Sequence, residues 1–230
     1  MPAKPGAALL FDIDGTLADT DHLHLQAFNI VFGPLGQSFD RARFKVELQG
    51  FANSDIAARL LPDLPAPRQM QIMQQKELTF RELAATGLEP MPGLLDLLDA
   101  ADAEGLPMAA VTNAPRANAE LILDGIGIRH RFGAIVIADE LDHGKPHPLP
   151  YLEGLRRLGA AAELTVAFED SISGVSSATA ATILTIGVLS SLTDKQLIDA
   201  GATATVSRYD EPALLSRIAT ITGAGIVRTG

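Results

Sequence analysis

Short apolar runs alternate with amphipathic segments over most of the second half of the chain. Five of these runs predict β-strands, at residues 106–112, 134–139, 164–170 and 182–188, with a weaker one near 204. Amphipathic spacing between them predicts helices, around residues 116–125, 148–158, 173–181, 194–199 and 211–221. Strict alternation of apolar strands and helices favours a parallel sheet covered by helices on both faces.

The first half of the chain has a different pattern. An apolar run at residues 7–11 predicts one more strand, and Gly15 predicts a turn after it. Residues 18–88 show helical spacing broken by GPLG and PDLPAP, and a further helix is expected to begin near Pro92. We therefore expect an α/β fold with two parts. They are a doubly wound parallel core of residues 1–17 and 90–230, and a small helical cap domain, residues 18–89, inserted after the first strand.

Composition narrows the classes of function. The 230 residues carry a formal charge of −10 with no basic stripe, so nucleic acid is not an expected partner. There is no cysteine, which excludes thiol nucleophiles, disulfides and thiolate metal sites. The uncharged stretch at 171–193 divides into a small-residue helix and a strand, so we expect no membrane span. The N-terminus does not have the pattern of a signal peptide, and a cytoplasmic location is expected.

Polar side chains follow four of the predicted strands. They are Asp12 and Asp14, Thr112 and Asn113, Lys145, and Glu169 and Asp170. The carboxyl ends of parallel strands collect ligands, so these groups should converge. Two carboxylates about 4 Å apart repel by about 4 kcal/mol at an effective dielectric of about 20, so the Asp12–Asp14 pair requires a compensating positive charge.

Four motifs carry a family resemblance: DIDGT at 12–16, VTN at 111–113, GKPHP at 144–148 and FEDSISG at 168–174. In order and spacing they resemble the motifs of the haloacid dehalogenase-like (HAD) hydrolase superfamily, from residue 9 to about residue 190. The helical insert is similar to the small cap of that family. The resemblance implies a Rossmann-like core and a cap that closes over the substrate, with hinges near residues 18–21 and 87–92.

The resemblance also implies a magnesium ion. A phosphate monoester carries about two negative charges and resists an anionic nucleophile until that charge is neutralised. Mg²⁺ prefers oxygen ligands, and the family pattern assigns it to Asp12, the Asp14 backbone carbonyl and Asp170, with Glu169 supporting a metal-bound water or Lys145.

Catalytic roles follow from the same alignment of motifs. Asp12 is expected to be the nucleophile that forms an aspartyl-phosphate. Asp14 would protonate the leaving oxygen and later deprotonate water, and since its reference pKa is about 3.9, this role needs a site that raises it. Lys145 and the Thr112 hydroxyl would stabilise the transferring phosphoryl group.

A second set of residues is predicted to contact the substrate. It comprises Asn113, Gly15, His24, Gln49, Gly50 and Asn53. His24 matches a position near the cap entrance in some sugar-phosphate members of the family, although a surface histidine fits the sequence equally well. Gln49 and Asn53 offer amides that could bind hydroxyl groups.

Several alternatives are open. β-Phosphoglucomutases carry basic residues where this chain has Gln49 and Asn53, and phosphonatases carry a cap lysine near Asn53, so both activities are disfavoured. Asp14 argues against a true dehalogenase. A receiver-like signalling domain would need its acidic pair adjacent on the first strand, and a non-catalytic phosphometabolite sensor would not need every chemical position filled. We expect a Mg²⁺-dependent phosphatase for a sugar phosphate or phosphoglycolate-like ester, as a monomer or homodimer.

Overall fold

A six-stranded, fully parallel sheet forms the centre of the protein. The computed structural model describes residues 2–226. The strands are β1 (Ala8–Phe11), β2 (Met108–Thr112), β3 (Ala134–Ile137), β4 (Thr165–Glu169), β5 (Leu184–Val188) and β6 (Ala204–Val206), in the order β3-β2-β1-β4-β5-β6. The predicted fold class is confirmed.

The central strand β1 lies at the point where the chain reverses its direction of winding. It pairs with β2 on one side and with β4 on the other, so that Phe11 is opposite both Ala110 and Phe168. In doubly wound sheets ligands bind in the crevice outside the carboxyl ends at this switch point. The residues that follow β1, β2 and β4 therefore face a common crevice.

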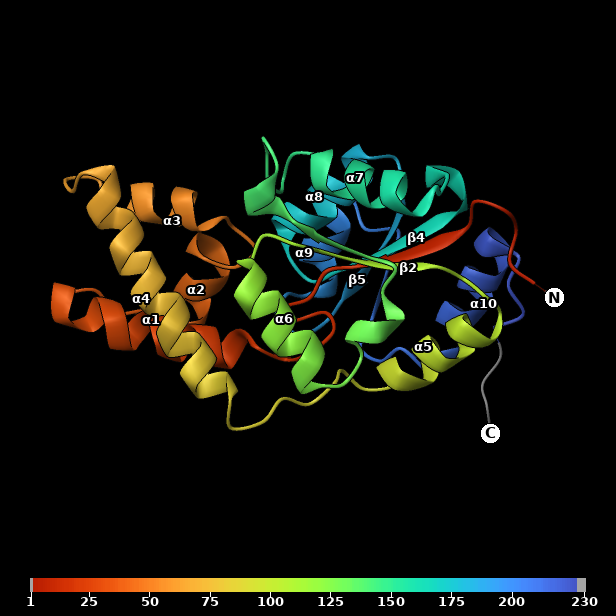
Figure 1. Ribbon diagram of the computed structural model, residues 1–230, viewed down its shortest axis with the longest axis horizontal. Coiled ribbons are helices and arrows are strands. Elements are labelled where there is room, and N and C mark those ends of the chain that lie inside the picture. The colour runs from red at the N-terminus through yellow and green to blue at the C-terminus, as the bar shows by residue number, and fades with distance from the viewer. Residues whose placement is uncertain (1, 227–230) are drawn as a thin grey trace.

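Both faces of the sheet are covered by helices (Figure 1). Helices α7 (Leu149–Leu158) and α8 (Ile172–Ala180) cover one face, and α5 (Leu94–Ala103), α6 (Arg116–Gly125) and α10 (Pro212–Thr222) cover the other. The short helix α9 (Asp194–Asp199) lies beside β5 and β6. Side chains alternate along β1, with Leu9 and Phe11 in one hydrophobic cluster and Ala8 and Leu10 in the other. This alternation explains why every position of the strand is apolar.

The helices within residues 18–89 pack together at one end of the molecule (Figure 1). They are α1 (Asp21–Phe32), α2 (Arg41–Glu47), α3 (Asn53–Leu60) and α4 (Ala66–Ala84). Their own hydrophobic cluster includes Phe28, Phe32, Phe39, Phe44 and Met73. These helices are the structural counterpart of the expected cap, and the domain boundaries at 17/18 and 89/90 stay a prediction.

The two connections between the helical part and the sheet run side by side. Ala18 forms β-bridges with Asp14 and Pro90, and the backbone N–H of Met91 donates to the carbonyl of Leu17 at 2.9 Å. The connections thus lie against each other where the hinges are expected.

Four short 3₁₀ segments complete the described elements. They are Gly33–Leu35, Arg129–Arg131, Ala138–Glu140 and Ala162–Leu164. The third corrects a prediction. The strand that was expected to reach residue 139 ends at Ile137, and the 3₁₀ segment begins at the next residue. Within residues 2–226, none of the helices combines the length and the apolar character that crossing a membrane requires.

Candidate active site

The turn after β1 brings two strand ends close together. The Asp12 backbone N–H donates to the carbonyl of Phe168 on β4 at 3.0 Å. Gly15 follows with φ of 74°, and a Cβ there would lie 2.1 Å from Oδ2 of Asp170. Only glycine accepts both the left-handed backbone and this close approach. Gly15 therefore shapes the site through its backbone.

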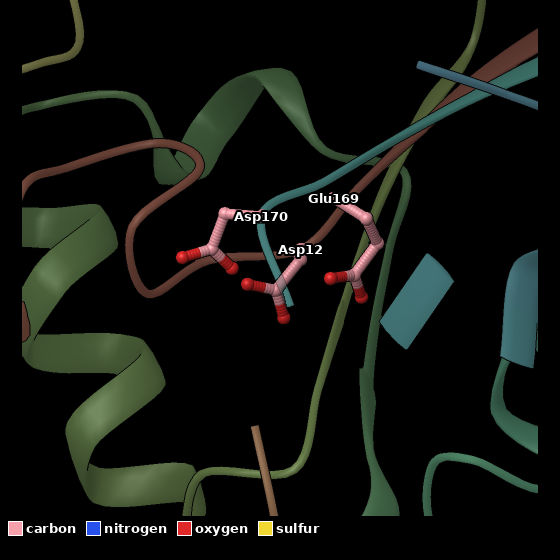
Figure 2. A group of neighbouring side chains, drawn as sticks. All are labelled: Asp12, Glu169 and Asp170. Carbon is pink, nitrogen blue, oxygen red and sulfur yellow. The ribbon is translucent and has the colours of Figure 1, made fainter. Parts of the chain in front are cut away.

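Three buried carboxylates form an acidic cluster, consisting of Asp12, Glu169 and Asp170 (Figure 2). One oxygen of each lies within 4.8 Å of the others. Hard oxygen donors at such spacing suit Mg²⁺, which takes few protein carboxylates and keeps several waters. The donor set therefore fits the predicted cofactor, with Asp12 and Asp170 as the carboxylates that face the cavity.

Lys145 lies within hydrogen-bond reach of three acceptors in this cluster and its surroundings. Its Nζ donates to Asp12 Oδ1 at 2.5 Å, to Glu169 Oε1 at 2.6 Å and to the Val111 carbonyl at 2.7 Å. The Tyr151 hydroxyl also donates to Glu169 Oε1, at 2.8 Å. Burial lowers the pKa of Lys145, but Asp12 and Glu169 outweigh burial and raise it above its usual value. Lys145 is therefore a fixed positive charge at the carboxylate of Asp12.

Burial has the opposite effect on the acids of the cluster. It raises the pKa of Asp12 to about 8, because desolvation together with the charges of Glu169 and Asp14 exceeds the effect of Lys145. Burial and the neighbouring charges of Asp21, Asp12 and Glu169 also raise the pKa of Asp170 well above its usual value. A divalent cation would reverse this balance by favouring both carboxylates in their charged form.

Asp14 lies outside the acidic cluster and is compensated separately. Its Oδ1 accepts hydrogen bonds from Thr20 Oγ1 at 2.7 Å and from His24 Nε2 at 2.9 Å. Burial raises its pKa, but His24, Thr20 and the charge of Lys76 outweigh burial, and the pKa lies below its usual value. The expectation of a raised pKa for Asp14 is therefore wrong for this arrangement. Asp12 and Asp14 coexist because each has its own positive or hydrogen-bonding partners.

His24 links the sheet to the cap helices and is largely buried. Its ring stacks on Phe80 at a centroid distance of 3.8 Å, and its Nδ1 lies 2.8 Å from Nζ of Lys76. Because an ammonium group can only donate, Nδ1 is the acceptor and the Nε2–H group donates to Asp14. The alternative of an exposed surface histidine is wrong.

Core side chains also bind the loop between α2 and α3. The Gly50 carbonyl accepts hydrogen bonds from Asn113 Nδ2 at 3.0 Å and from Ser173 Oγ at 2.6 Å. Asn113 Oδ1 in turn accepts from the backbone N–H of Lys145 at 2.9 Å. One side-chain amide thus couples the position of this cap loop to the position of Lys145.

Substituting Gly50 tests this docking. Gly50 has φ of 75°, and a Cβ would lie 2.6 Å from Ser171 Oγ and 2.7 Å from Ser173 Oγ. Because left-handed strain costs about 1–3 kcal/mol and the clash displaces the loop, Gly50→Ala should lower kcat/KM about tenfold or more. Gly36→Ala is the matched control, because Gly36 has φ of 79° and open space around it. Equal losses of kcat/KM in the two variants would show that docking of this loop has no role.

Gln49 and Asn53 line the cavity, and their amides have protein partners. Gln49 Nε2 lies 2.8 Å from Asp170 Oδ2 and 2.7 Å from Ser191 Oγ, and Asn53 hydrogen-bonds to Glu77. Their predicted contacts with a substrate stay a prediction.

The structure brings most of the predicted residues to one cavity between the sheet and the cap helices. Its lining includes Asp12, Asp14, His24, Gln49, Gly50, Asn53, Thr112, Asn113, Lys145 and Asp170. Glu169 contacts the cavity residue Lys145, whose Nζ donates to it. The Thr112 Oγ1 atom accepts a hydrogen bond from the backbone N–H of Ala114 at 2.9 Å. The sequence interpretation missed Lys76 and Glu77, which also line the cavity. Their signal was a pair of charges on the apolar face of α4, beside Ile72, Met73 and Phe80.

Comparison with known proteins gives consistent matches. A family model described as haloacid dehalogenase-like hydrolase matches residues 9–188. A fructose-1-phosphate phosphatase of Escherichia coli is 33% identical, covering 76% of this chain and 92% of that protein. A phosphorylated carbohydrates phosphatase of Thermotoga maritima is 32% identical, covering 86% and 93%. A crystal structure of a substituted CbbY from Rhodobacter sphaeroides with xylulose-(1,5)-bisphosphate is 31% identical, with a TM-score of 0.79 over 89% of this chain and 95% of that one.

Proposed function

The chain belongs to the haloacid dehalogenase-like hydrolase family as a phosphoric monoester hydrolase, and we propose that it cleaves a small phosphate monoester through Asp12 with the help of Mg²⁺. The observation that carries the proposal is the contact of Asp12 with Lys145 in a cavity that Asp170 also lines. This is the arrangement that nucleophilic attack on a phosphoryl group requires, because a carboxylate is oriented beside fixed positive charge.

The reaction has two halves. In the first, an Asp12 oxygen attacks phosphorus, the bond between phosphorus and the ester oxygen breaks, and that oxygen receives a proton from Asp14. In the second, Asp14 takes a proton from water, whose oxygen attacks the aspartyl-phosphate and releases inorganic phosphate and free Asp12. The low pKa of Asp14 suits the second half. The first half requires that substrate binding weaken the hydrogen bonds from Thr20 and His24.

Asp12, Asp170 and the backbone carbonyl of Asp14 are the groups that would hold the magnesium ion. Bound there, Mg²⁺ would neutralise charge on the phosphoryl oxygens and favour the ionised form of Asp12. Lys145, which donates to Asp12 Oδ1, has the same electrostatic effect on that carboxylate.

The substrate we propose is a phosphorylated sugar or a small acid of the phosphoglycolate type. Relatives named as phosphatases for fructose 1-phosphate, phosphorylated carbohydrates and phosphoglycolate support this range. A mutase would need a cationic group at Gln49, whose amide instead lies against Asp170. The proposed activity is therefore hydrolysis.

A panel of phosphate monoesters tests the function. Phosphate release from at least one sugar monophosphate should need added Mg²⁺, and chelation should lower the rate by about 100-fold or more, because Asp12 then stays largely protonated and the charge of the phosphoryl group is not neutralised. Readdition of Mg²⁺ should restore the rate. Glucose 1-phosphate should give phosphate rather than an isomer. Hydrolysis that is indifferent to chelation, or isomerisation without phosphate release, would overturn the proposal.

A further inference from the structure

The side of the cavity that the cap helices form, here called the cap wall, contains a buried ion pair. Lys76 Nζ donates to Glu77 Oε1 at 3.0 Å, and the two side chains are only 4% and 7% exposed. Both lie on the buried face of α4, and Lys76 Nζ also lies 4.5 Å from the centre of the Phe28 ring. Charged side chains are rarely buried to this degree without a partner or a function.

Glu77 is held firmly in this wall. Asn118 Nδ2 donates to Glu77 Oε2 at 2.6 Å, and Asn53 also hydrogen-bonds to the carboxylate. Asn118 is completely buried on α6, and its Oδ1 accepts from Arg81 Nη1 at 2.7 Å. Burial raises the pKa of Glu77, but the charge of Lys76 and the hydrogen bonds from the amides of Asn53 and Asn118 outweigh burial and lower it. Glu77 therefore stays charged where it lines the cavity.

Lys76 and Glu77 carry no net charge as a pair. Lys76 alone would be a buried cation available to an anionic group of the substrate, and Glu77 neutralises it at 3.0 Å. The cap lines the cavity with four further polar residues, which are Asp21 and His24 on α1 and the neutral amides of Gln49 and Asn53. A second phosphate or a carboxylate on the substrate would meet a Lys76 that is already paired with Glu77, so it would find no unpaired positive charge and would lie close to the Glu77 carboxylate.

We propose that Glu77 is a specificity-determining residue that restricts the cavity to monophosphate esters whose far end is uncharged and rich in hydroxyl groups. The proposal rests on the proposed function and narrows its substrate class to sugar monophosphates, excluding bisphosphates and phosphoglycolate-like acids. Glu77 and Asn53 offer acceptors and a donor to hydroxyl groups, while like-charge repulsion disfavours anions. The CbbY relative is known with a bisphosphate, so the fold itself admits a second phosphate and the side chains decide.

The test compares fructose 1-phosphate with fructose 1,6-bisphosphate, which differ at one end. Wild-type protein should favour the monophosphate in kcat/KM by tenfold or more. Glu77→Gln removes the charge and frees Lys76 for an anion, so this preference should fall at least tenfold. Glu82→Gln, an exposed position on the same helix, is the control and should leave the preference unchanged.

A second variant keeps the test independent of how well Glu77→Gln folds. Asn53→Arg adds a cation next to Glu77, so the preference for the monophosphate should fall in this variant as well. An unchanged preference in every folded variant, or a wild-type preference for the bisphosphate, would overturn the role of Glu77. Failure of wild-type protein to hydrolyse any monoester with Mg²⁺ would instead overturn the proposed function.

Discussion

Asp12→Asn should abolish phosphate release from p-nitrophenyl phosphate, with a loss in kcat of about 10⁴-fold or more. The reason is chemical, because a neutral amide cannot form the acyl phosphate and loss of a nucleophile removes a whole reaction path. The substitution should leave the surroundings of residue 12 in place, because Lys145 keeps its hydrogen bonds to Glu169 and to the Val111 carbonyl. Steady-state nitrophenolate release at saturating Mg²⁺ is the measurement.

The stability of this variant provides the control. Burial raises the pKa of Asp12 to about 8 in the folded protein. Without metal, the unfolded chain therefore loses the Asp12 proton from about pH 4, while the folded protein keeps it up to about pH 8, and the free energy of unfolding falls over this range. Asparagine carries no such cost, so the variant should melt at or above the wild-type Tm at pH 8 in chelator. Added Mg²⁺ should raise the Tm of the wild type more than that of the variant. Turnover close to wild type would remove Asp12 from the nucleophile role.

The fold could be predicted because its strands are apolar on both faces. A buried parallel strand such as β1 is a continuous apolar run in the sequence, and the turns between strands and helices fix the boundaries to within one or two residues. The prediction was wrong at residues 138 and 139, because Ala138–Glu140 form a 3₁₀ segment whose hydrogen bonding the apolar pattern does not reveal. The strand order could be argued only by analogy, since periodicity does not say which strands are neighbours.

The convergence of the strand-end residues was accessible for the same reason. Asp12, Lys145 and Asp170 follow elements whose order places them at one edge of the sheet. What the sequence did not reveal depends on contacts between segments far apart in the chain. Burial raises the pKa of Asp14, but His24, Thr20 and Lys76 outweigh burial and lower it, and Lys76 is 62 positions away from Asp14 in the sequence. Charges on the apolar face of an amphipathic helix were the signal for Lys76 and Glu77.

The cap loop and the reacting groups form one connected unit. Asn113 joins Gly50 to the backbone of Lys145, and Gln49 joins the same loop to Asp170. Opening the cap would break both links, so we expect that displacement of this loop perturbs the groups around Asp12. Coupling of this kind lets a lid that excludes water also complete the catalytic arrangement.

Asp14→Asn should separate the two halves of the reaction. For a sugar monophosphate, whose leaving alkoxide needs a proton, the first half should slow by about 10²–10⁴-fold. For p-nitrophenyl phosphate the leaving anion is stable without a proton, so the first half should remain fast. The second half should still be slow with either ester, since the substituted amide cannot take a proton from water. Rapid mixing with p-nitrophenyl phosphate should therefore show a burst of nitrophenolate close to one equivalent, followed by slow turnover.

Thr20→Val provides the matched variant for this experiment. It removes one of the two hydrogen bonds to Asp14 Oδ1 and leaves the carboxylate and His24 in place. The pKa of Asp14 should rise because a bond to its charged form is lost, and the first half should stay within about tenfold of wild type with sugar monophosphates. If Asp14→Asn slows the first half equally for both esters and gives no burst, Asp14 does not act as the acid. In that case the proton must reach the leaving oxygen from another group, and the hydrogen bonds of Asp14 to Thr20 and His24 would mark a structural role.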